Sequence, residues 1–473
     1  MAIDTPTTPS DQAVTAAPSR LTTRAKLILF VLCAAQFMIA LDFSILNVSL
    51  PVLGKDLGMS QANLQWAVTA FALPSGGFLL LFGRIADLFG RRKLFLAGLA
   101  VFTAASVVAT LAWDPTVFLI GRAIQGLGAA VIVPTGMSLL TTTFPEGPQR
   151  DRALGISGTL LSLGFTIGVV LGGVLTDTFG WRSTMALLGI AGVIVLAAAP
   201  GLLTESRNAH RPRIDVPGAV TVTGGLLAVI YALSTASQRG FGGADVIVAL
   251  VAGVALLAAF VVVESRVAEP MVSLRMLRRP SVAWGNLAGI TTFSMMSTVV
   301  FLLTLYLQEI RGLSAFQTGL VFGVQGAAAA VTGATAARVI GRFGVRRTLV
   351  GGMLVQAALT AALVFLGDGS YGTWLALAAV TIGCVGHLWV IVSYGITATS
   401  GLPDHEQGLA TGLVTSSQQL GITIGIPLLG ALAASRANLL DGVRLALGLD
   451  AAIVAAVAVL VAAGLGLRDR ASR

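Results

Sequence analysis

The chain alternates long, uncharged, mostly apolar runs with short charged segments along most of its length. A helix rising 1.5 Å per residue needs ~20 residues to cross ~30 Å of hydrocarbon, and the apolar runs have about this length. The pattern therefore predicts fourteen transmembrane helices, within residues 27–51, 57–83, 94–113, 115–145, 153–176, 183–204, 216–238, 246–263, 281–308, 312–337, 348–367, 369–403, 407–435 and 451–467.

Three short sequence similarities indicate that the two halves of the chain are related. Residues 57–60 and 89–92 resemble residues 311–314 and 343–346, 254 positions later, and residues 164–168 resemble residues 421–425, 257 positions later. Similarities in the same order and at nearly one spacing are typical of a duplicated transporter. We therefore expect an all-α polytopic membrane protein with two six-helix bundles and a central two-helix insertion.

The domain boundaries follow from this division. Residues 26–204 are predicted to form the N-terminal six-helix bundle, and residues 281–467 the C-terminal one. Residues 205–280 are then a linker that contains the central two-helix hairpin. Residues 1–25 are rich in Thr, Pro, Ala and Ser and predict a disordered cytoplasmic tail, and residues 468–473 form a second cytoplasmic tail.

Composition supports a membrane protein. Charged residues make up 11% of the 473 residues and apolar residues 55%, whereas soluble domains carry about 25% charge. The net charge of +9 does not indicate a nucleic-acid partner, because most Lys and Arg residues are spread over the tails and the loops that follow even-numbered spans. Positive residues are retained on the cytoplasmic side. We therefore expect a multi-pass protein of the cytoplasmic membrane with both termini inside.

Two charged residues within the predicted spans are the main candidates for chemistry. Asp42 is the only acidic residue that this division places deep inside a span, about 24 Å along the helix from Lys26. An ionised carboxylate at mid-membrane costs roughly 2.5 to 3.5 kcal/mol, so Asp42 is expected to bind and release protons. Arg122 is the only base within a span and would favour the ionised form of a nearby carboxyl group. A permanent ion pair, or a structural arginine near a helix end, remains the alternative.

Three motifs resemble the major facilitator superfamily, and within it the fourteen-span drug:proton antiporter branch. They are the loop Gly83 to Lys93, the segment Arg122 to Ala130 and the segment Leu41 to Pro51. The resemblance covers essentially all of residues 26–467. It implies proton and substrate coupling at Asp42 and assistance in proton coupling by Arg122.

The loop motif is expected to act in gating. Gly83 and Gly90 allow tight turns and close helix approach. Asp87 can pair with basic side chains or with a helix N-terminus of the other bundle, while Arg91 and Arg92 also anchor the loop on the cytoplasmic side. Gly341 occupies the position of Asp87 in the second copy, so the latch is expected to be asymmetric.

A stripe of glycines along the fifth span resembles the antiporter signature of the superfamily. It comprises Gly164, Gly168, Gly172 and Gly173, and small residues of this kind allow close helix packing. Ordinary packing is the alternative reading. The proline that usually follows the fourth-position glycine is Val169 here, and Pro427 lies in the matching helix of the second half.

Polar, aromatic and methionine residues within the spans are candidates for the lining of a central cavity. The candidates are Phe43, Asn47, Trp66, Phe71, Gln125, Met295, Gln325 and Gln418. Glu309, at the outer end of its span, is a second acidic candidate, for substrate or proton entry.

The function expected from these features is proton-coupled efflux of lipophilic or cationic drugs, or of an antibiotic natural product, by alternating access. We expect the protein to work as a monomer on a small-molecule substrate and protons, without a cofactor, a metal or enzymatic activity. A nucleotide-binding loop of the G-x-x-x-x-G-K-[ST] type is not found in the sequence, so energy is expected to come from a gradient. The alternatives are a proton-linked importer or facilitator of a small metabolite, and a membrane sensor or scaffold that does not transport.

Overall fold

The computed structural model describes residues 22–144, 148–205, 215–240, 242–267, 272, 274–402 and 404–471, and the described residues form helices and connecting turns without β-strands. The first half contains α1 (Thr23–Asp56), α2 (Gln61–Leu64), α3 (Trp66–Gly77), α4 (Leu79–Phe89), α5 (Arg91–Thr110), α6 (Pro115–Thr143), α7 (Pro148–Phe179) and α8 (Arg182–Leu202).

The insertion and the second half are also helical. The insertion consists of α9 (Val216–Arg239) and α10 (Ala244–Glu264). The second half contains α11 (Leu274–Leu277), α12 (Pro280–Leu305), the π-helix η1 (Tyr306–Ile310), α13 (Ala315–Phe343), α14 (Val345–Ala362), the 3₁₀-helix η2 (Leu363–Phe365), α15 (Tyr371–Thr399), α16 (Asp404–Ala434) and α17 (Leu439–Ala471).

Among the described residues, eleven helices are long and apolar enough to cross a membrane, and thirteen spans result if each of two bent helix pairs is one span. One pair is α3 with α4, bent by 44°, and the other lies within α13, bent by 55°. The predicted fifth span corresponds to α7, whose apolar segment Leu163–Phe179 is shorter than the others. The prediction of fourteen spans therefore depends on α7 crossing as well.

The helix ends are set by local chemistry. The Asp114 carboxylate accepts hydrogen bonds from the amides of Thr116 and Val117, with Pro115 at the first helical position of α6. Ser314 and Gln317 form a reciprocal capping box at the start of α13. These contacts satisfy amides that have no partner within the helix, and they fix where each span begins.

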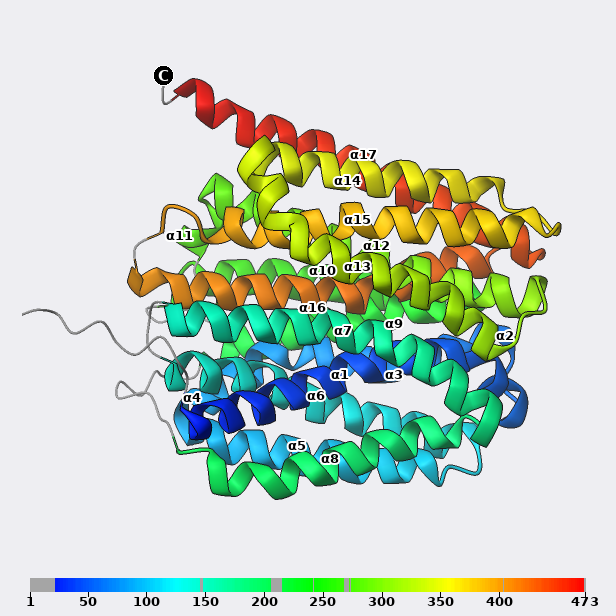
Figure 1. Cartoon of the computed structure of the whole chain (residues 1–473), viewed down its shortest axis with the longest axis horizontal. Coiled ribbons are helices and arrows are strands. Elements are labelled where there is room, and N and C mark those ends of the chain that lie inside the picture. Colours follow the sequence, from blue (N-terminus) through cyan, green and yellow to red (C-terminus); the bar gives the residue numbers. More distant parts are fainter. Residues whose placement is uncertain are drawn as a thin grey trace, which may run out of the picture.

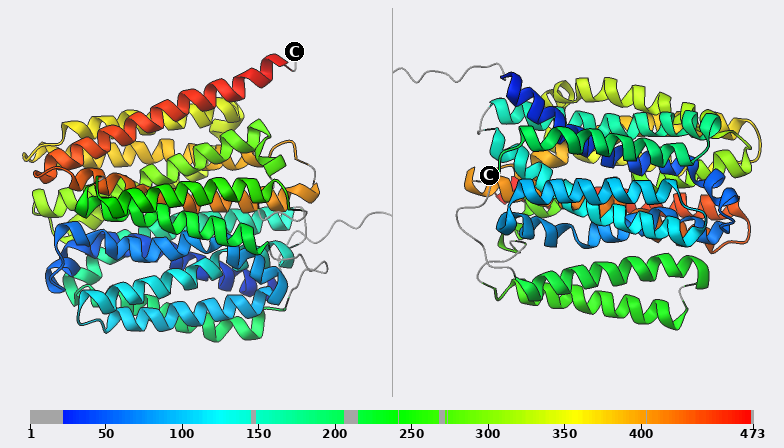
Figure 2. Two further views of the ribbon diagram at one scale, coloured as in Figure 1. Left: turned by 180° about the vertical axis from the view of Figure 1, so that it is seen from behind. Right: turned by 90° about the horizontal axis from the view of Figure 1, so that it is seen from below.

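Helix packing reproduces the duplication that the sequence predicts. Gly90 and Gly344, 254 residues apart, both have positive φ, of 109° and 83°, and each ends one helix and starts the next. The pair α1 and α7 in the first half corresponds to the pair α12 and α16 in the second. Two bundles related by this repeat run side by side, with the insertion α9–α10 along one side of them (Figures 1 and 2).

The insertion packs along the line where the two bundles meet. Helix α9 contacts both α3 and α16. Gln65, just before α3, donates a hydrogen bond of 3.0 Å to the carbonyl of Ser234 on α9. Helix α10 packs on α9 and presents several valines and Ile247 outward, as expected of a surface in contact with lipid.

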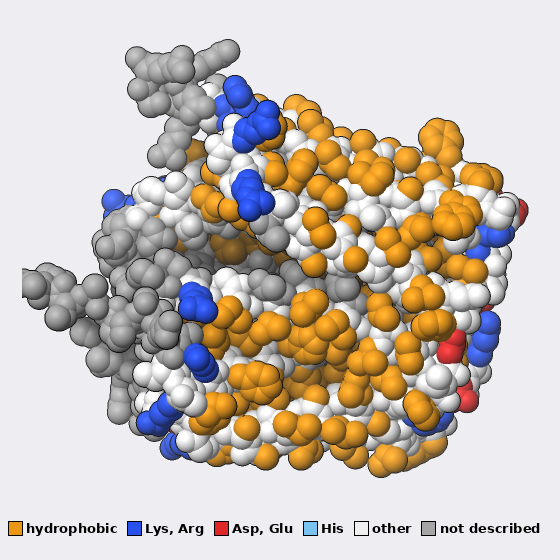
Figure 3. Space-filling model, in the orientation of Figure 1, with side chains coloured by type: hydrophobic (Ala, Val, Ile, Leu, Met, Phe, Trp, Pro, Cys, Tyr) orange, Lys and Arg blue, Asp and Glu red, His pale blue; other side chains and the backbone are white. Residues whose placement is uncertain are grey.

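The two ends of the molecule differ in charge. We call the end with Thr23, the start of α1, the termini face, and the opposite end the far face. Figure 3 shows an apolar surface between bands of charged side chains at these two ends. The Arg-rich turns after α4 and α13 lie at the termini face, whereas the far face carries Lys55, Arg182 and several acidic residues.

Two predicted boundaries change. Helix α17 begins at Leu439, twelve residues before the predicted span, and continues to Ala471. Asp450 therefore lies within a span, and the prediction that Asp42 is the only deep acid is wrong. The predicted span begins only after Asp450, because the prediction treats any charged residue as the end of an uncharged run. The proposed tail 1–25 lies outside the described residues up to residue 21, and α1 already includes residues 23–25.

Candidate functional site

Asp42 and Arg122 form a buried ion pair between α1 and α6. Their nearest atoms, Arg122 Nη1 and Asp42 Oδ1, are 2.6 Å apart, and the side chain of Asp42 is 0% exposed and that of Arg122 is 1% exposed. Asp42 Oδ2 is buried without a hydrogen-bond partner among the described residues. The carboxylate therefore has one oxygen engaged by a cation and one available for a proton or another donor.

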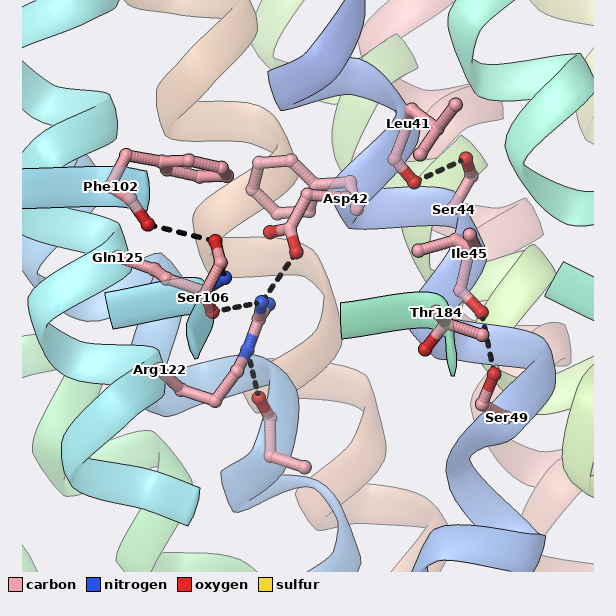
Figure 4. Close-up of polar contacts among 12 residues, drawn as sticks. Leu41, Asp42, Ser44, Ile45, Ser49, Phe102, Ser106, Arg122, Gln125 and Thr184 are labelled. Atoms are coloured by element: carbon pink, nitrogen blue, oxygen red, sulfur yellow. Dashed lines mark hydrogen bonds and ion pairs between the residues drawn. The ribbon is translucent and has the colours of Figure 1, made fainter. Parts of the chain in front are cut away.

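A short chain of hydrogen bonds holds the guanidinium in place (Figure 4). Arg122 Nη1 donates to Gln125 Oε1 at 2.9 Å, and Gln125 Nε2 donates to Ser106 Oγ on α5 at 2.7 Å. Arg122 Nε donates to the carbonyl of Ala67 on α3 at 3.2 Å. The pair is thus positioned by α1, α3, α5 and α6 together.

An aromatic ring lies over the guanidinium. Its central carbon lies 4.6 Å from the centroid of the Phe71 ring, and Phe43 meets the same ring edge-on at 4.9 Å. A cation over an aromatic face is favoured, more so away from water. Phe43 and Phe71 were candidates for the cavity lining. In this arrangement Phe71 lies over Arg122, and Phe43 packs against the Phe71 ring.

Gln125 has a different place from the one predicted. It is fully buried, and both ends of its amide are occupied, by Arg122 and by Ser106. It therefore belongs to the support of the ion pair rather than to a cavity wall. Sequence reasoning missed Ser106, because a serine in an apolar span has no distinguishing pattern.

The glycine stripe lets α7 approach the helix that carries Asp42. A Cβ atom at Gly164 would lie 2.9 Å from the Phe37 carbonyl oxygen, and one at Gly172 would lie 2.7 Å from the Ile45 carbonyl oxygen. At Gly168 it would meet Ser44 Oγ and lie 2.9 Å from the Leu41 carbonyl oxygen, next to Asp42. Gly173 instead faces Ala315 of α13 in the other bundle.

Replacement of Gly168 by Ala is therefore expected to weaken the fold. The added methyl group overlaps Ser44 and a backbone oxygen, and overpacking of this kind costs about 1 to 3 kcal/mol. The matched control is Gly155→Ala on the same helix, where a Cβ atom has nothing within 4 Å. Thermal unfolding of the purified variants measures the difference. An unfolding temperature of Gly168→Ala as high as that of Gly155→Ala would contradict the packing argument.

Arg92 of the loop motif contacts α8 and the segment that follows it. The Arg92 guanidinium donates to the Pro200 carbonyl of α8 at 2.7 Å. The backbone amide of Arg92 donates to the Glu205 carboxylate at 3.2 Å. Gly90 has a φ of 109° and lies against the Glu205 carboxylate. The latch is predicted at Asp87, whose side chain is not among those that the structure describes.

The other residues that are predicted to act in gating lie within helices or at their ends. Gly83 is on α4, where a Cβ atom would lie 3.6 Å from Pro134, and Arg91 is the first residue of α5. Gly341, the counterpart of Asp87, has open space around it.

Asn47 and Trp66 lie in different surroundings. Asn47 is buried on α1, donates to the Phe43 carbonyl at 2.6 Å, and leaves its Oδ1 without a partner among the described residues. Trp66 is not deep in the molecule. It begins α3 near the far face, close to Tyr231 of α9, and lines a depression of about 320 Å³ with Gly58, Met59, Asn63, Pro115 and Leu119.

The candidates of the second half lie apart from the ion pair. The Thr360 hydroxyl on α14 donates to the sulfur of Met295 at 3.8 Å. The amide nitrogen of Gln325, Nε2, donates to the sulfur of Met296 at 3.5 Å. Gln418 is half-buried on α16.

Contacts at the far face join the two bundles. Glu309 on η1 pairs with Lys55 of α1 at 3.3 Å. The neighbouring Gln308 donates to the Val48 carbonyl at 2.8 Å, and the amide of Phe316 donates to Asp177 at 3.0 Å. Glu309 is therefore part of the closure of the far face in this arrangement. Sequence reasoning did not pair it, because Lys55 and Glu309 are 254 residues apart.

The fold and the buried ion pair between α1 and α6 define a membrane transporter with two related bundles. The model of the Major Facilitator Superfamily matches residues 32–426, so the chain belongs to this family.

Curated relatives cover most of the chain. The cephamycin export protein CmcT of Amycolatopsis lactamdurans is 38% identical over 419 residues, which span 86% of this chain and 85% of that protein. The puromycin resistance protein pur8 of Streptomyces alboniger is 36% identical over 408 residues, 85% of this chain and 80% of that protein.

A solved structure supports the fold alone. A crystal structure of a POT peptide transporter in complex with sulfate has a TM-score of 0.71 at 13% identity, covering 96% of both chains.

Proposed function

We propose that the protein is a proton-coupled antiporter that exports a lipophilic or cationic small molecule, such as an antibiotic, by alternating access. The names of the relatives, which include an export protein and a resistance protein, support the direction of transport. The observation that carries the coupling is the buried Asp42–Arg122 pair with one carboxylate oxygen unengaged.

The ion pair suggests how proton binding drives the cycle. A proton on Asp42 removes the negative charge that holds Arg122, so the pair loosens and the packing of α1 against α6 can change. A cationic substrate competes with that proton for the same carboxylate. Binding of one ligand therefore requires the release of the other, which is the condition for exchange.

The far-face contacts fit one of the two states of alternating access. Lys55–Glu309 and Gln308–Val48 tie the bundles together at that end. We propose that the far face is the outer side and that the termini face is cytoplasmic, since the Arg-rich turns after α4 and α13 lie at the termini face. The structure then corresponds to a state closed to the outside. We further propose that the monomer is the working unit.

The test is uptake of a fluorescent lipophilic cation and a panel of antibiotics into inside-out membrane vesicles with an imposed pH gradient. Accumulation that depends on an acidic interior and collapses with a protonophore is expected. Accumulation of a compound by right-side-out vesicles under an inward proton gradient would instead favour an importer. Flux that is independent of the pH gradient in both inside-out and right-side-out vesicles would contradict proton coupling.

A further inference from the structure

Asp450 is a second buried acid, and nothing in the proposed cycle uses it. It lies on α17 and is 3% exposed. Eleven residues separate it from Leu439 at the far-face end of the helix, about 17 Å along the axis. Asp42 lies fourteen residues from Asp56, about 21 Å from the same face. The two acids are thus at similar depth, one in each bundle.

The surroundings of Asp450 are apolar. It belongs to the inward stripe of α17 that contains Val443, Leu447, Val454 and Ala458, each 0% exposed, and this helix packs on α12, α14 and α16. Asp450 makes no hydrogen bond or ion pair with the described part of the chain, and its Oδ2 is buried without a partner. Asp42, in contrast, has Arg122.

The helices around Asp450 offer no cation at its level. Helix α12 contains no titratable residue, and those of α14 are Arg346 and Arg347 in its first turn, at the termini face. Helix α16 has Asp404, His405 and Glu406 at its start, at the same face, and η1 contributes Tyr306 and Glu309. On α17 itself the preceding charges are Asp441 and Arg444, and Arg444 is bonded to the Leu366 carbonyl.

The other bundle has an apolar residue at the corresponding place. Arg92 donates to the Pro200 carbonyl of α8, and its repeat partner Arg346 donates to the Ala462 carbonyl of α17. Ala462 lies 262 residues after Pro200. The same spacing relates Asp450 to Leu188, which is 0% exposed. A leucine suits this core position, so packing alone does not explain the acid.

We propose that Asp450 is a second proton-binding site of the transporter, neutral in the state closed at the far face and ionised at another stage of the cycle. An ionised carboxylate without a partner is costly at mid-membrane, which favours the neutral form here. Release moves the proton from a carboxyl oxygen to water and leaves a carboxylate, and rebinding reverses this. The inference rests on the proton-coupled exchange proposed above and deepens it.

Infrared spectroscopy of the full-length protein in lipid vesicles tests this inference, because it detects the C=O stretch of a neutral buried carboxyl group and requires no transport. Spectra are compared between about pH 5 and about pH 9, a range that brackets the titration of perturbed carboxyl groups. We expect a carboxyl band that is lost at high pH, is absent from Asp450→Asn, persists in Asp42→Asn and is shifted in frequency in Asp450→Glu.

Two results would overturn the inference. A band assigned to Asp450 that keeps its full intensity over the whole range would mean a permanently neutral, structural acid. Absence of any such band would mean a permanently ionised one. If Asp450→Asn does not fold, the shifted band of Asp450→Glu still gives the assignment, and Asp450→Leu supplies the residue found in the other bundle. Vesicle flux without proton dependence would refute the proposed function while leaving the infrared titration readable, so the two failures are distinguishable.

Discussion

The Asp42→Asn variant is expected to lose gradient-driven export almost completely and to lose part of its stability, because Arg122 keeps a buried charge without a counter-charge. An asparagine side chain has nearly the same shape, and its oxygen can still accept the hydrogen bond from Arg122 Nη1 that Asp42 Oδ1 accepts at 2.6 Å. It cannot bind and release a proton in the relevant range, so exchange stops. A decrease of at least about 100-fold in pH-dependent uptake by inside-out vesicles is expected, which corresponds to about 2.7 kcal/mol or more.

Asp56→Asn is the matched control, because it removes an acid from the same helix at an exposed position. Asp56 pairs with Arg182 at 2.6 Å, with side chains 47% and 44% exposed, and such surface pairs contribute little. Its transport should stay within about twofold of the wild type. Retention of pH-dependent export by Asp42→Asn would remove this carboxylate from the coupling mechanism and leave the ion pair as a structural contact.

The Arg122→Gln variant is expected to lower stability far more than removal of an exposed arginine does. Removal of one partner of a buried ion pair leaves the other charge uncompensated, at a cost of about 3 to 5 kcal/mol. Asp42 then becomes neutral by proton uptake or destabilises α1 against α3 and α6. Lower thermal stability of the purified protein and loss of export are both expected. Arg182→Gln, which removes an exposed arginine, should change stability by less than about 1 kcal/mol.

The double variant Asp42→Asn with Arg122→Gln separates stability from coupling. Two neutral amides can hydrogen-bond in the same space, so its unfolding temperature should lie above that of Arg122→Gln, a non-additive result for residues in direct contact. Export should remain absent, since neither side chain can exchange a proton. Recovery of transport together with stability would show that the pair acts only in packing.

The arrangement around Asp42 shows which parts of the site could be predicted from the sequence. An acid and a base in otherwise uncharged spans are visible as isolated exceptions, because charge is costly in hydrocarbon. Their contact is not visible, since Asp42 and Arg122 are 80 residues apart and meet only when α1 and α6 pack. Likewise, Gln125 could not be assigned to the support of Arg122 before its hydrogen bond to Ser106 on α5 was known.

Asp450 and Glu309 show that the surroundings of a residue cannot be read from a local criterion. Asp450 ended a predicted span because it is charged, yet α17 passes through it and buries it. Glu309 is predicted as a second acidic candidate at the outer end of its span, and the packing of the two bundles brings it to Lys55 of the first. Both outcomes depend on neighbours contributed by other helices.

The sequence by itself determined most of the helical spans, the duplication and the family, because hydrophobic length and short repeated motifs are properties of contiguous residues. It also determined which carboxylate and which guanidinium lie in otherwise uncharged runs. Only the tertiary structure decided that the two form a pair, that glycines bring α7 against the backbone beside Asp42, and that Asp450 is buried alone. Those features arise from contacts between residues far apart in the chain, and the energy of a buried charge depends on which partner those contacts supply.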